Sequence, residues 1–199
     1  MRKASLVENR GKQQIVWRRR NSIEACNPLQ TRSISRPTIS FMTVTHIIER
    51  LRERLAADPF SRDITGNRFR ASPPASPAAM ARAEAALGFA LPATLRAIYL
   101  DVANGGSGPG CGVMGVDGGF TDDRKMTVVR LHHVFLGRDP DDPTWQWNED
   151  WLPFCHWGCG VYSIVDARAP YPVSYIDPGS KDIGAPMSSI VLPHKDTLD

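Results

Sequence analysis

The chain from residue 43 onward opens with a helical pattern of apolar positions. Apolar residues recur at steps of three and four, with arginine and glutamate residues between them: Val44, Ile47, Ile48, Leu51 and Leu55. This spacing predicts an amphipathic helix that ends near Asp58-Pro59. Its apolar stripe is expected to pack against a core rather than against a partner protein.

Proline and glycine mark the ends of two further helices. Ser76 is a favoured N-cap residue, Pro77 occupies the first helical position, and Gly88 can take the left-handed conformation that ends a helix. Pro92 opens the next helix in the same way. The buried edges of the two helices are expected to hold Met80, Ala83, Ala86, Leu87, Leu95, Ile98, Tyr99 and Val102.

The second half of the chain has the apolar runs of strands, separated by Gly, Pro and Asp turns. The predicted strands cover residues 113–116, 126–131, 151–157, 161–165 and 173–176. The polar residues 61–76, before the second helix, are predicted to form a loop or linker. Helices followed by strands predict an α+β domain in which N-terminal helices pack on a mixed or mainly antiparallel sheet.

Charge divides the chain into a basic arm and an acidic domain. Residues 1–41 hold nine Lys or Arg against two Glu, a balance of +7, and residues 42–199 hold fifteen against nineteen, a balance of −4. The arm is rich in Arg, Ser, Asn and Gln and is expected to be disordered. Three interpretations stay open: a nucleic-acid-binding tail around Trp17-Arg18-Arg19-Arg20, a transit peptide, or sequence upstream of a true start at Met42. We favour the last.

The sequence also bears on compartment and redox state. It shows neither the apolar h-region of a secretory signal nor an apolar run long enough to cross a bilayer, so the expected compartment is the cytoplasm. The four cysteines are then expected to be reduced thiols, and they are Cys26, Cys111, Cys155 and Cys159.

The sequence predicts none of three kinds of site chemistry: a zinc site, a phosphate-binding loop or a cysteine nucleophile. Cys155, His156 and Cys159 lack the second ligand couple of a zinc site. The glycine-rich residues 105–112 follow a helix and precede a strand, the reverse of a phosphate-binding loop, so their glycines are attributed to a sharp turn with positive φ. Cys155 as a nucleophile would need an imidazole from elsewhere, because the neighbouring His156 points away in a strand. We therefore predict no catalytic residue, metal or cofactor.

The ordered motifs between residues 72 and 178 resemble the SUKH superfamily, which includes the fungal Smi/Knr cell-wall regulators and bacterial immunity proteins. The residues that carry this resemblance are Leu87, Gly88, Leu91, Pro92, Tyr99, Asn104, Gly105, Gly106, Gly108, Pro109, Leu152, Pro153, Trp157, Gly158 and Gly160. The resemblance implies a single α+β domain over residues 42–199 in which these residues are structural. The superfamily closes with a C-terminal helix, which this chain is expected to lack because it stops at Thr197-Leu198-Asp199.

The resemblance implies a binding protein, most simply an immunity protein that neutralises a cognate toxin domain such as a nuclease. The candidate partner-binding residues are acidic groups beside two tryptophans: Asp122, Asp123, Asp139, Asp141, Asp142, Trp145 and Trp147. Trp can anchor an interface and acidic groups can steer a basic partner, but the same tryptophans could fill the core. The alternatives are a regulatory scaffold of the Smi/Knr type and, third, a thiol-dependent enzyme. Neither a membrane nor a nucleic acid is expected as the partner.

Overall fold

The computed structural model of the chain describes residues 2–9, 12–19, 43–62, 66–122, 124–195 and 197–198, the first two ranges as backbone only. Its helices are α1 (Val44–Ala57), α2 (Pro77–Leu87), α3 (Ala93–Asp101) and α4 (Val128–Leu136). The main sheet comprises β5 (Trp151–Gly158), β6 (Val161–Asp166), β7 (Val173–Ile176) and β8 (Val191–Lys195), with the 3-10 turns η1 (Pro178–Ser180) and η2 (Met187–Ile190) before β8. The predicted α+β class is confirmed.

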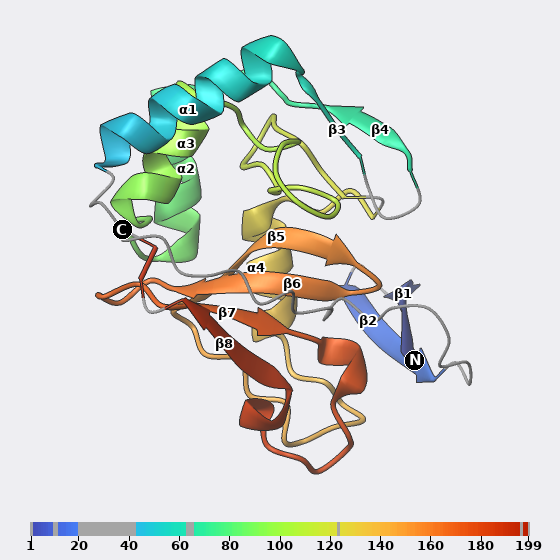
Figure 1. Cartoon of the computed structure of the whole chain (residues 1–199). Coiled ribbons are helices and arrows are strands. Elements are labelled where there is room, and N and C mark those ends of the chain that lie inside the picture. The colour runs from blue at the N-terminus through green and yellow to red at the C-terminus, as the bar shows by residue number, and fades with distance from the viewer. Residues whose placement is uncertain are drawn as a thin grey trace, which may run out of the picture.

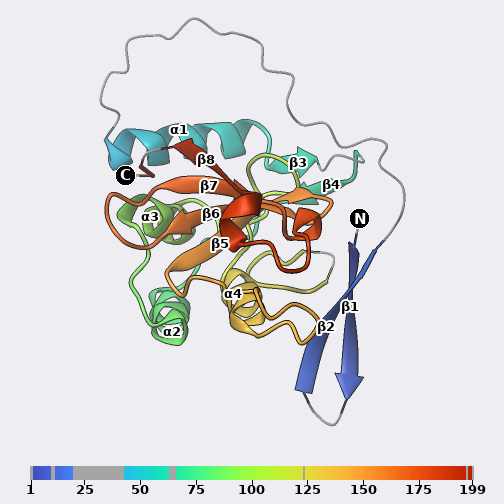
Figure 2. The same cartoon turned by 90° about the horizontal axis from the view of Figure 1, so that it is seen from below.

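The main sheet is an antiparallel meander in the order β5-β6-β7-β8. It crosses the middle of the molecule, with α1 and α3 above it and η1 and η2 below it (Figure 1). Seen from below, α2 and α4 lie next to each other along one side of the sheet (Figure 2). The core between helices and sheet contains Met80, Leu95, Tyr99, Leu131, Phe135, Leu152, Tyr162 and Ile176.

The three predicted helices are confirmed, and so are the predicted ends of α2, whereas α3 begins one residue after Pro92, which is its N-cap. Ser76 Oγ accepts a hydrogen bond from the Ala79 N–H at 3.1 Å, and Gly88 ends α2 with φ 84°. Most of the expected edge residues are buried or half-buried, but Ala86 is exposed, because the buried stripe of α2 passes through Ala79 instead. In α1 only Ile48 is fully buried, since this helix packs at the periphery against α3.

Three predictions of the strand pattern are wrong. Residues 126–131 lead into helix α4, where Val128, Leu131, His132 and Phe135 are buried at helical spacing and Thr127 caps the start. Residues 113–116 form no strand, only an isolated bridge between Val113 and Cys155. Residues 61–76 are not entirely loop, because β3 (Phe60–Arg62) and β4 (Arg68–Arg70) pair there as an antiparallel hairpin. The strand β8 was not predicted.

Part of the basic arm also differs from the expected disorder. The strands β1 (Arg2–Asn9) and β2 (Lys12–Arg19) form an antiparallel hairpin in which Leu6 pairs with Ile15 and Ser5 with Val16. Residues such as Val7, Ile15 and Val16 favour strands, and this local preference was underestimated beside the polar composition. Arg20, Cys26 and Met42 lie outside the described residues, so the interpretations of the arm stay predictions.

A buried amide joins the glycine-rich loop to the segments on either side of it. Asn104 is 3% exposed. Its Oδ1 accepts from the Val116 N–H at 2.8 Å and its Nδ2 donates to the Asp117 carbonyl at 3.3 Å. Its backbone N–H donates to the Pro73 carbonyl at 3.1 Å, and its carbonyl accepts from the Phe120 N–H at 2.9 Å. One residue therefore ties together three segments of backbone.

The next residue must be glycine for two separate reasons. Gly105 has φ 78°, which L side chains rarely adopt. A Cβ atom there would lie 2.6 Å from both the Gly115 nitrogen and the Val113 oxygen, so the backbone itself would have to move. The Gly105 carbonyl also accepts from the Ser72 N–H at 3.0 Å. The positive φ predicted for this loop is confirmed here.

Replacing Gly105 should therefore cost far more than replacing a glycine of similar φ in open space. Gly118 is the matched control, with φ 76° and nothing within 4 Å of its Cβ position. We expect Gly118→Ala to lower the free energy of unfolding by about 1 kcal/mol, and Gly105→Ala by about 3 kcal/mol or more, because the clash adds to the strain. Urea unfolding followed by tryptophan fluorescence measures both. Equal losses would mean that the close backbone approach is unimportant.

Candidate functional site

The two motifs that carry the family resemblance lie side by side. The Cys111 N–H donates to the His156 carbonyl at 2.7 Å, and the His156 N–H donates to the Gly112 carbonyl at 3.1 Å. A Cβ atom on Gly110 would lie 2.7 Å from the Cα of Trp157. The glycine loop therefore covers the free edge of β5 by backbone contact, which requires residues without side chains.

The other motif residues also serve the fold. Tyr99 is fully buried, and its hydroxyl donates to the Met114 carbonyl at 2.7 Å. The remaining residues lie in the core, at helix ends or in turns: Leu87, Leu91 and Leu152 in the core, Gly88 and Pro92 at helix ends, Gly106, Gly108 and Pro109 in the glycine loop, Pro153 inside β5, and Gly158 and Gly160 at the turn into β6. Their positions are those of a structural framework.

The thiols considered for catalysis or metal binding do not converge. Cys155 is 2% exposed, and its Sγ lies 3.6 Å from the Pro109 carbonyl oxygen. Burial, with a smaller contribution from Cys111, raises the pKa of the Cys155 thiol to about 12. Cys159 is exposed in the turn between β5 and β6. No cluster of three or more His, Cys, Asp or Glu with metal-binding geometry occurs in the part of the chain that the structure describes.

The histidines bridge backbone segments or pack against rings. His132 Nδ1 donates to the Trp151 carbonyl at 3.0 Å, and burial lowers the pKa of this imidazole. His133 Nε2 donates to the Ala86 carbonyl at 2.9 Å. The buried His156 ring stacks on Tyr162 with centroids 4.8 Å apart. The contacts of His132 and His133 link α4 to β5 and α2, and the His156 ring packs between β5 and β6.

The two candidate tryptophan anchors are core residues, so of the two interpretations left open for them the structure supports core packing. Trp145 and Trp147 are 8% and 9% exposed and pack on Phe135 of α4, with ring centroids 5.9 and 4.6 Å away. Their Nε1 atoms donate to the Phe135 carbonyl at 2.8 Å and the Trp151 carbonyl at 3.0 Å. The sequence of residues 138–150 does not reveal this burial, because the packing partner Phe135 belongs to α4, and the apolar pattern of residues 126–131 predicts a strand there instead of a helix.

The predicted acidic residues divide into buried and exposed groups. Asp122 is 6% exposed, and its Oδ1 accepts from the Met126 N–H at 2.8 Å, so it shapes a turn. Asp142 is 2% exposed. Asp141 is exposed and Asp139 is half-buried, while Asp123 lies outside the described residues. Asp122 and Asp142 are therefore unavailable for steering a partner.

Asp142 forms a buried ion pair that the sequence did not reveal. Lys181 Nζ lies 2.7 Å from Asp142 Oδ2, and the two side chains are 1% and 2% exposed. Thr144 completes the cluster: its Oγ1 donates to Asp142 Oδ1 at 2.6 Å, and Lys181 Nζ donates to Thr144 Oγ1 at 2.8 Å. Burial alone would raise the pKa of Asp142, but the hydrogen bonds from Lys181 and Thr144 outweigh it and hold that pKa well below its usual range.

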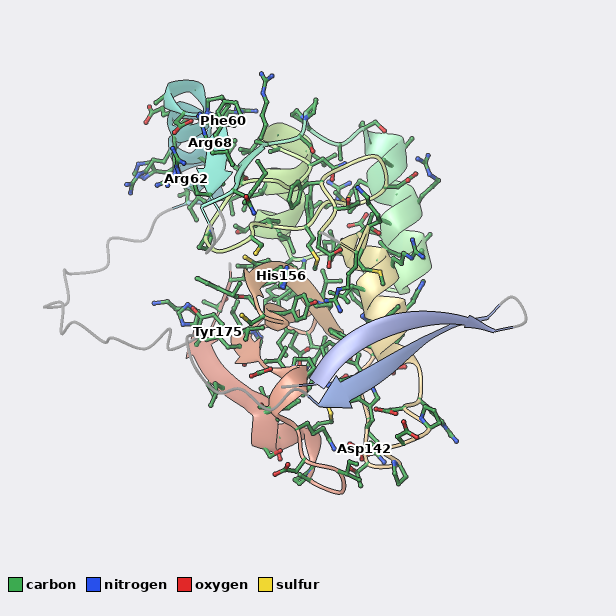
Figure 3. All side chains as sticks on the ribbon, turned by 90° about the vertical axis from the view of Figure 1, so that its right-hand side faces the viewer. Phe60, Arg62, Arg68, Asp142, His156 and Tyr175 are labelled. Atoms are coloured by element: carbon green, nitrogen blue, oxygen red, sulfur yellow. The ribbon has the colours of Figure 1, made fainter. Side chains whose placement is uncertain are left out.

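This pair joins two loops into one end of the molecule, at the bottom of Figure 3. The Gly184 N–H also donates to Asp142 Oδ1, at 3.4 Å. These loops carry the exposed residues Asp141, Asp182 and Ile183 and the half-buried Asp139, and we call these four residues the acidic platform. Ile183 is 58% exposed, so the platform combines carboxylates with an apolar side chain. Asp182 and Ile183 were missed because only the pairing through Lys181 brings them to the aspartate loop.

A second feature missed in the sequence is an aromatic strip on the sheet face that points away from Phe135. Trp157 Nε1 donates to Ser163 Oγ at 2.7 Å. The Trp157 and Tyr175 rings meet edge to face at 5.3 Å, and Tyr175 packs on His194 at 4.5 Å. The period of two in β7 could have placed Tyr175 on this face, but His194 belongs to the unpredicted strand β8.

The protein is an α+β domain, and the residues of its sequence motifs serve the geometry of the backbone. The chain matches the family model of the SMI1/KNR4 family (SUKH-1) over residues 74–183, more than half of its length, and it belongs to this family. No curated protein matches the chain. Within the described ranges, no helix has the length and apolar character needed to span a bilayer.

Removing the Asp142 charge should destabilise the protein strongly. Asp142→Asn leaves Lys181 buried without its counter-charge, so we expect a loss of about 3–5 kcal/mol in the free energy of unfolding. Asp141→Asn, at the exposed neighbouring residue, should change it by less than about 0.5 kcal/mol. The double variant Asp142→Asn with Lys181→Met should regain part of the loss. Urea denaturation measures all three, and similar values for the two single variants would contradict the role of the pair.

The same pair predicts how stability depends on pH. Because the pKa of Asp142 is lowered in the folded protein, its contribution is complete above the unfolded carboxyl pKa of about 3.9 and is lost as the pH falls below that value. Asp142→Asn should therefore lose less stability on acidification than the native chain. Thermal unfolding between neutral pH and about pH 3 tests this difference.

The buried thiol should resist alkylation in the folded protein. At about pH 8, iodoacetamide should modify Cys159 readily and leave Cys155 unmodified until urea unfolds the chain. Peptide-resolved mass spectrometry measures both rates in one sample, with the unfolded protein as the control. Equal rates for the two thiols before unfolding would show that Cys155 is reactive.

Proposed function

We propose that this chain is a non-enzymatic binding protein of the immunity type, which binds and neutralises a basic toxin domain. The observation that carries the proposal is its membership of the SMI1/KNR4 family (SUKH-1). The raised pKa of the buried Cys155 supports a non-enzymatic role, because a thiol with a pKa of about 12 holds its proton at neutral pH.

The acidic platform has the chemistry that such a partner would need. Its carboxylates can steer a basic surface into contact and its apolar Ile183 can be buried there. The ion pair between Asp142 and Lys181 holds both loops in place before binding. Less conformational entropy is then lost on association.

The proposal is tested by calorimetric titration of the full chain with a catalytically disabled toxin domain encoded by the neighbouring gene. We expect stoichiometric binding at nanomolar affinity, a free energy of about −12 kcal/mol. Absence of binding by a folded protein would contradict the immunity role and favour a regulatory scaffold of the Smi/Knr type.

Charge reversal locates the interface. Asp141→Lys with Asp182→Lys should slow association by about tenfold or more at low salt and by less at high salt, because salt screens exposed charges. The control is Glu49→Lys with Glu53→Lys, which changes the net charge equally at the exposed surface of α1. Stopped-flow association rates compare the two. Equal slowing would indicate a net-charge effect and would remove the acidic platform from the interface.

A further inference from the structure

The β3–β4 hairpin presents one face to the core and another to solvent. In the register of the hairpin, Phe60 pairs with Arg70 and Arg62 with Arg68. Partners across an antiparallel pair share a face, and alternate residues along a strand do too. Phe60, Arg62, Arg68 and Arg70 therefore point the same way, and all four are exposed. We call this set the arginine face.

The opposite face anchors the hairpin to the domain. Phe69 is half-buried, and its ring lies 5.0 Å from the ring of Phe120. The Ala71 N–H donates to the Pro59 carbonyl at 3.0 Å, which closes the base of the hairpin. Because one side is held in this way, the arginine face keeps a fixed direction toward solvent.

The three arginines of this face form no ion pair with a carboxylate of the described residues. The ion pairs of the described domain use other cations, such as Arg52 with Asp101 and Arg82 with Asp117. Like charges directly across a hairpin repel each other, as Arg62 and Arg68 do here. The hairpin thus places three arginines on one face of a domain whose overall charge balance is negative.

One guanidinium is already oriented for binding. The Arg68 Cζ lies 4.2 Å from the centroid of the Phe60 ring, a cation–π contact. This contact covers a face of the ring and restrains the guanidinium, whose planar N–H groups can still pair with a carboxylate in bidentate fashion. Phe60 is 40% exposed, so the ring serves here as a support at the surface.

We propose that the arginine face is a second interaction surface, which binds an acidic segment of a protein partner. Charge complementarity selects the ligand, and two observations favour carboxylates over nucleic acid. The guanidinium of Arg68 occupies a ring face on which a base would stack. The negative balance of residues 42–199 opposes a long polyanion but tolerates a short acidic segment.

The arginine face lies at the opposite end of the molecule from the acidic platform. Figure 3 shows Phe60, Arg62 and Arg68 at the top and Asp142 at the bottom, with Tyr175 between them in height. A basic partner on the acidic platform would therefore leave the arginine face accessible. The inference is independent of the proposed function and can fail or succeed separately from it.

The test measures binding of a fluorescent Glu-rich peptide to the full chain by fluorescence anisotropy at low salt. Arg62→Glu with Arg68→Glu should weaken binding by about tenfold or more. The control, Arg54→Glu with Arg138→Glu, changes the net charge equally at other exposed positions and should keep the affinity within about twofold. The basic arm is present in every variant, so any peptide that binds to it gives the same background in each titration.

A third variant separates geometry from charge. Phe60→Ala changes no charge but removes the ring that positions Arg68, so it should weaken peptide binding several-fold with an unchanged thermal midpoint. Three outcomes would each overturn the proposal. The first is equal weakening of peptide binding in the Arg62/Arg68 and the Arg54/Arg138 double variants. The others are native affinity in Phe60→Ala and no binding by the folded native chain. An oligothymidylate with the same charge as the peptide is also titrated. If it binds more tightly than the peptide, and Arg62→Glu with Arg68→Glu abolishes that binding, the face is assigned to nucleic acid instead. If the native chain self-associates, and both Arg62→Glu with Arg68→Glu and Asp141→Lys with Asp182→Lys abolish the association equally, the arginine face is assigned to a second copy of the chain.

Discussion

The buried amide of Asn104 is the contact on which the rest of the domain depends. A side-chain amide both donates and accepts, so this one residue satisfies backbone groups of Val116 and Asp117 while its own backbone bonds to two further segments. A buried backbone group without a partner would cost about 1–3 kcal/mol. The amide therefore holds the glycine loop in the position from which it covers the edge of β5, the strand that borders the core.

The ion pair between Asp142 and Lys181 plays a comparable role at the other end of the molecule. A buried pair contributes little net stability compared with apolar packing, but losing one partner is costly. Its effect is therefore to define one arrangement of two loops, which places Asp141 and Asp182 on a common surface. Together with the arginine face, this arrangement places acidic and basic side chains at opposite ends of a small domain (Figure 3).

Much of the secondary structure was predictable because its signals are local. Ser76 and Gly88 mark the ends of α2 within a few residues, and the apolar runs of β5, β6 and β7 needed no information from elsewhere. Helix α4 was missed because a short apolar run is compatible with both helix and strand. Its cap at Thr127 and the spacing of Leu131 and Phe135 were the available signals.

The sequence by itself determined the family, the α+β class and the positions that require glycine or proline, since these follow from turn geometry and caps over short distances. Only the tertiary structure decided which polar and aromatic residues reach solvent. Asp141 and Asp142 are adjacent and chemically identical, yet one is exposed and the other is buried. The difference arises from Lys181, 39 residues further along the chain. Burial depends on such distant partners, and no local pattern encodes them.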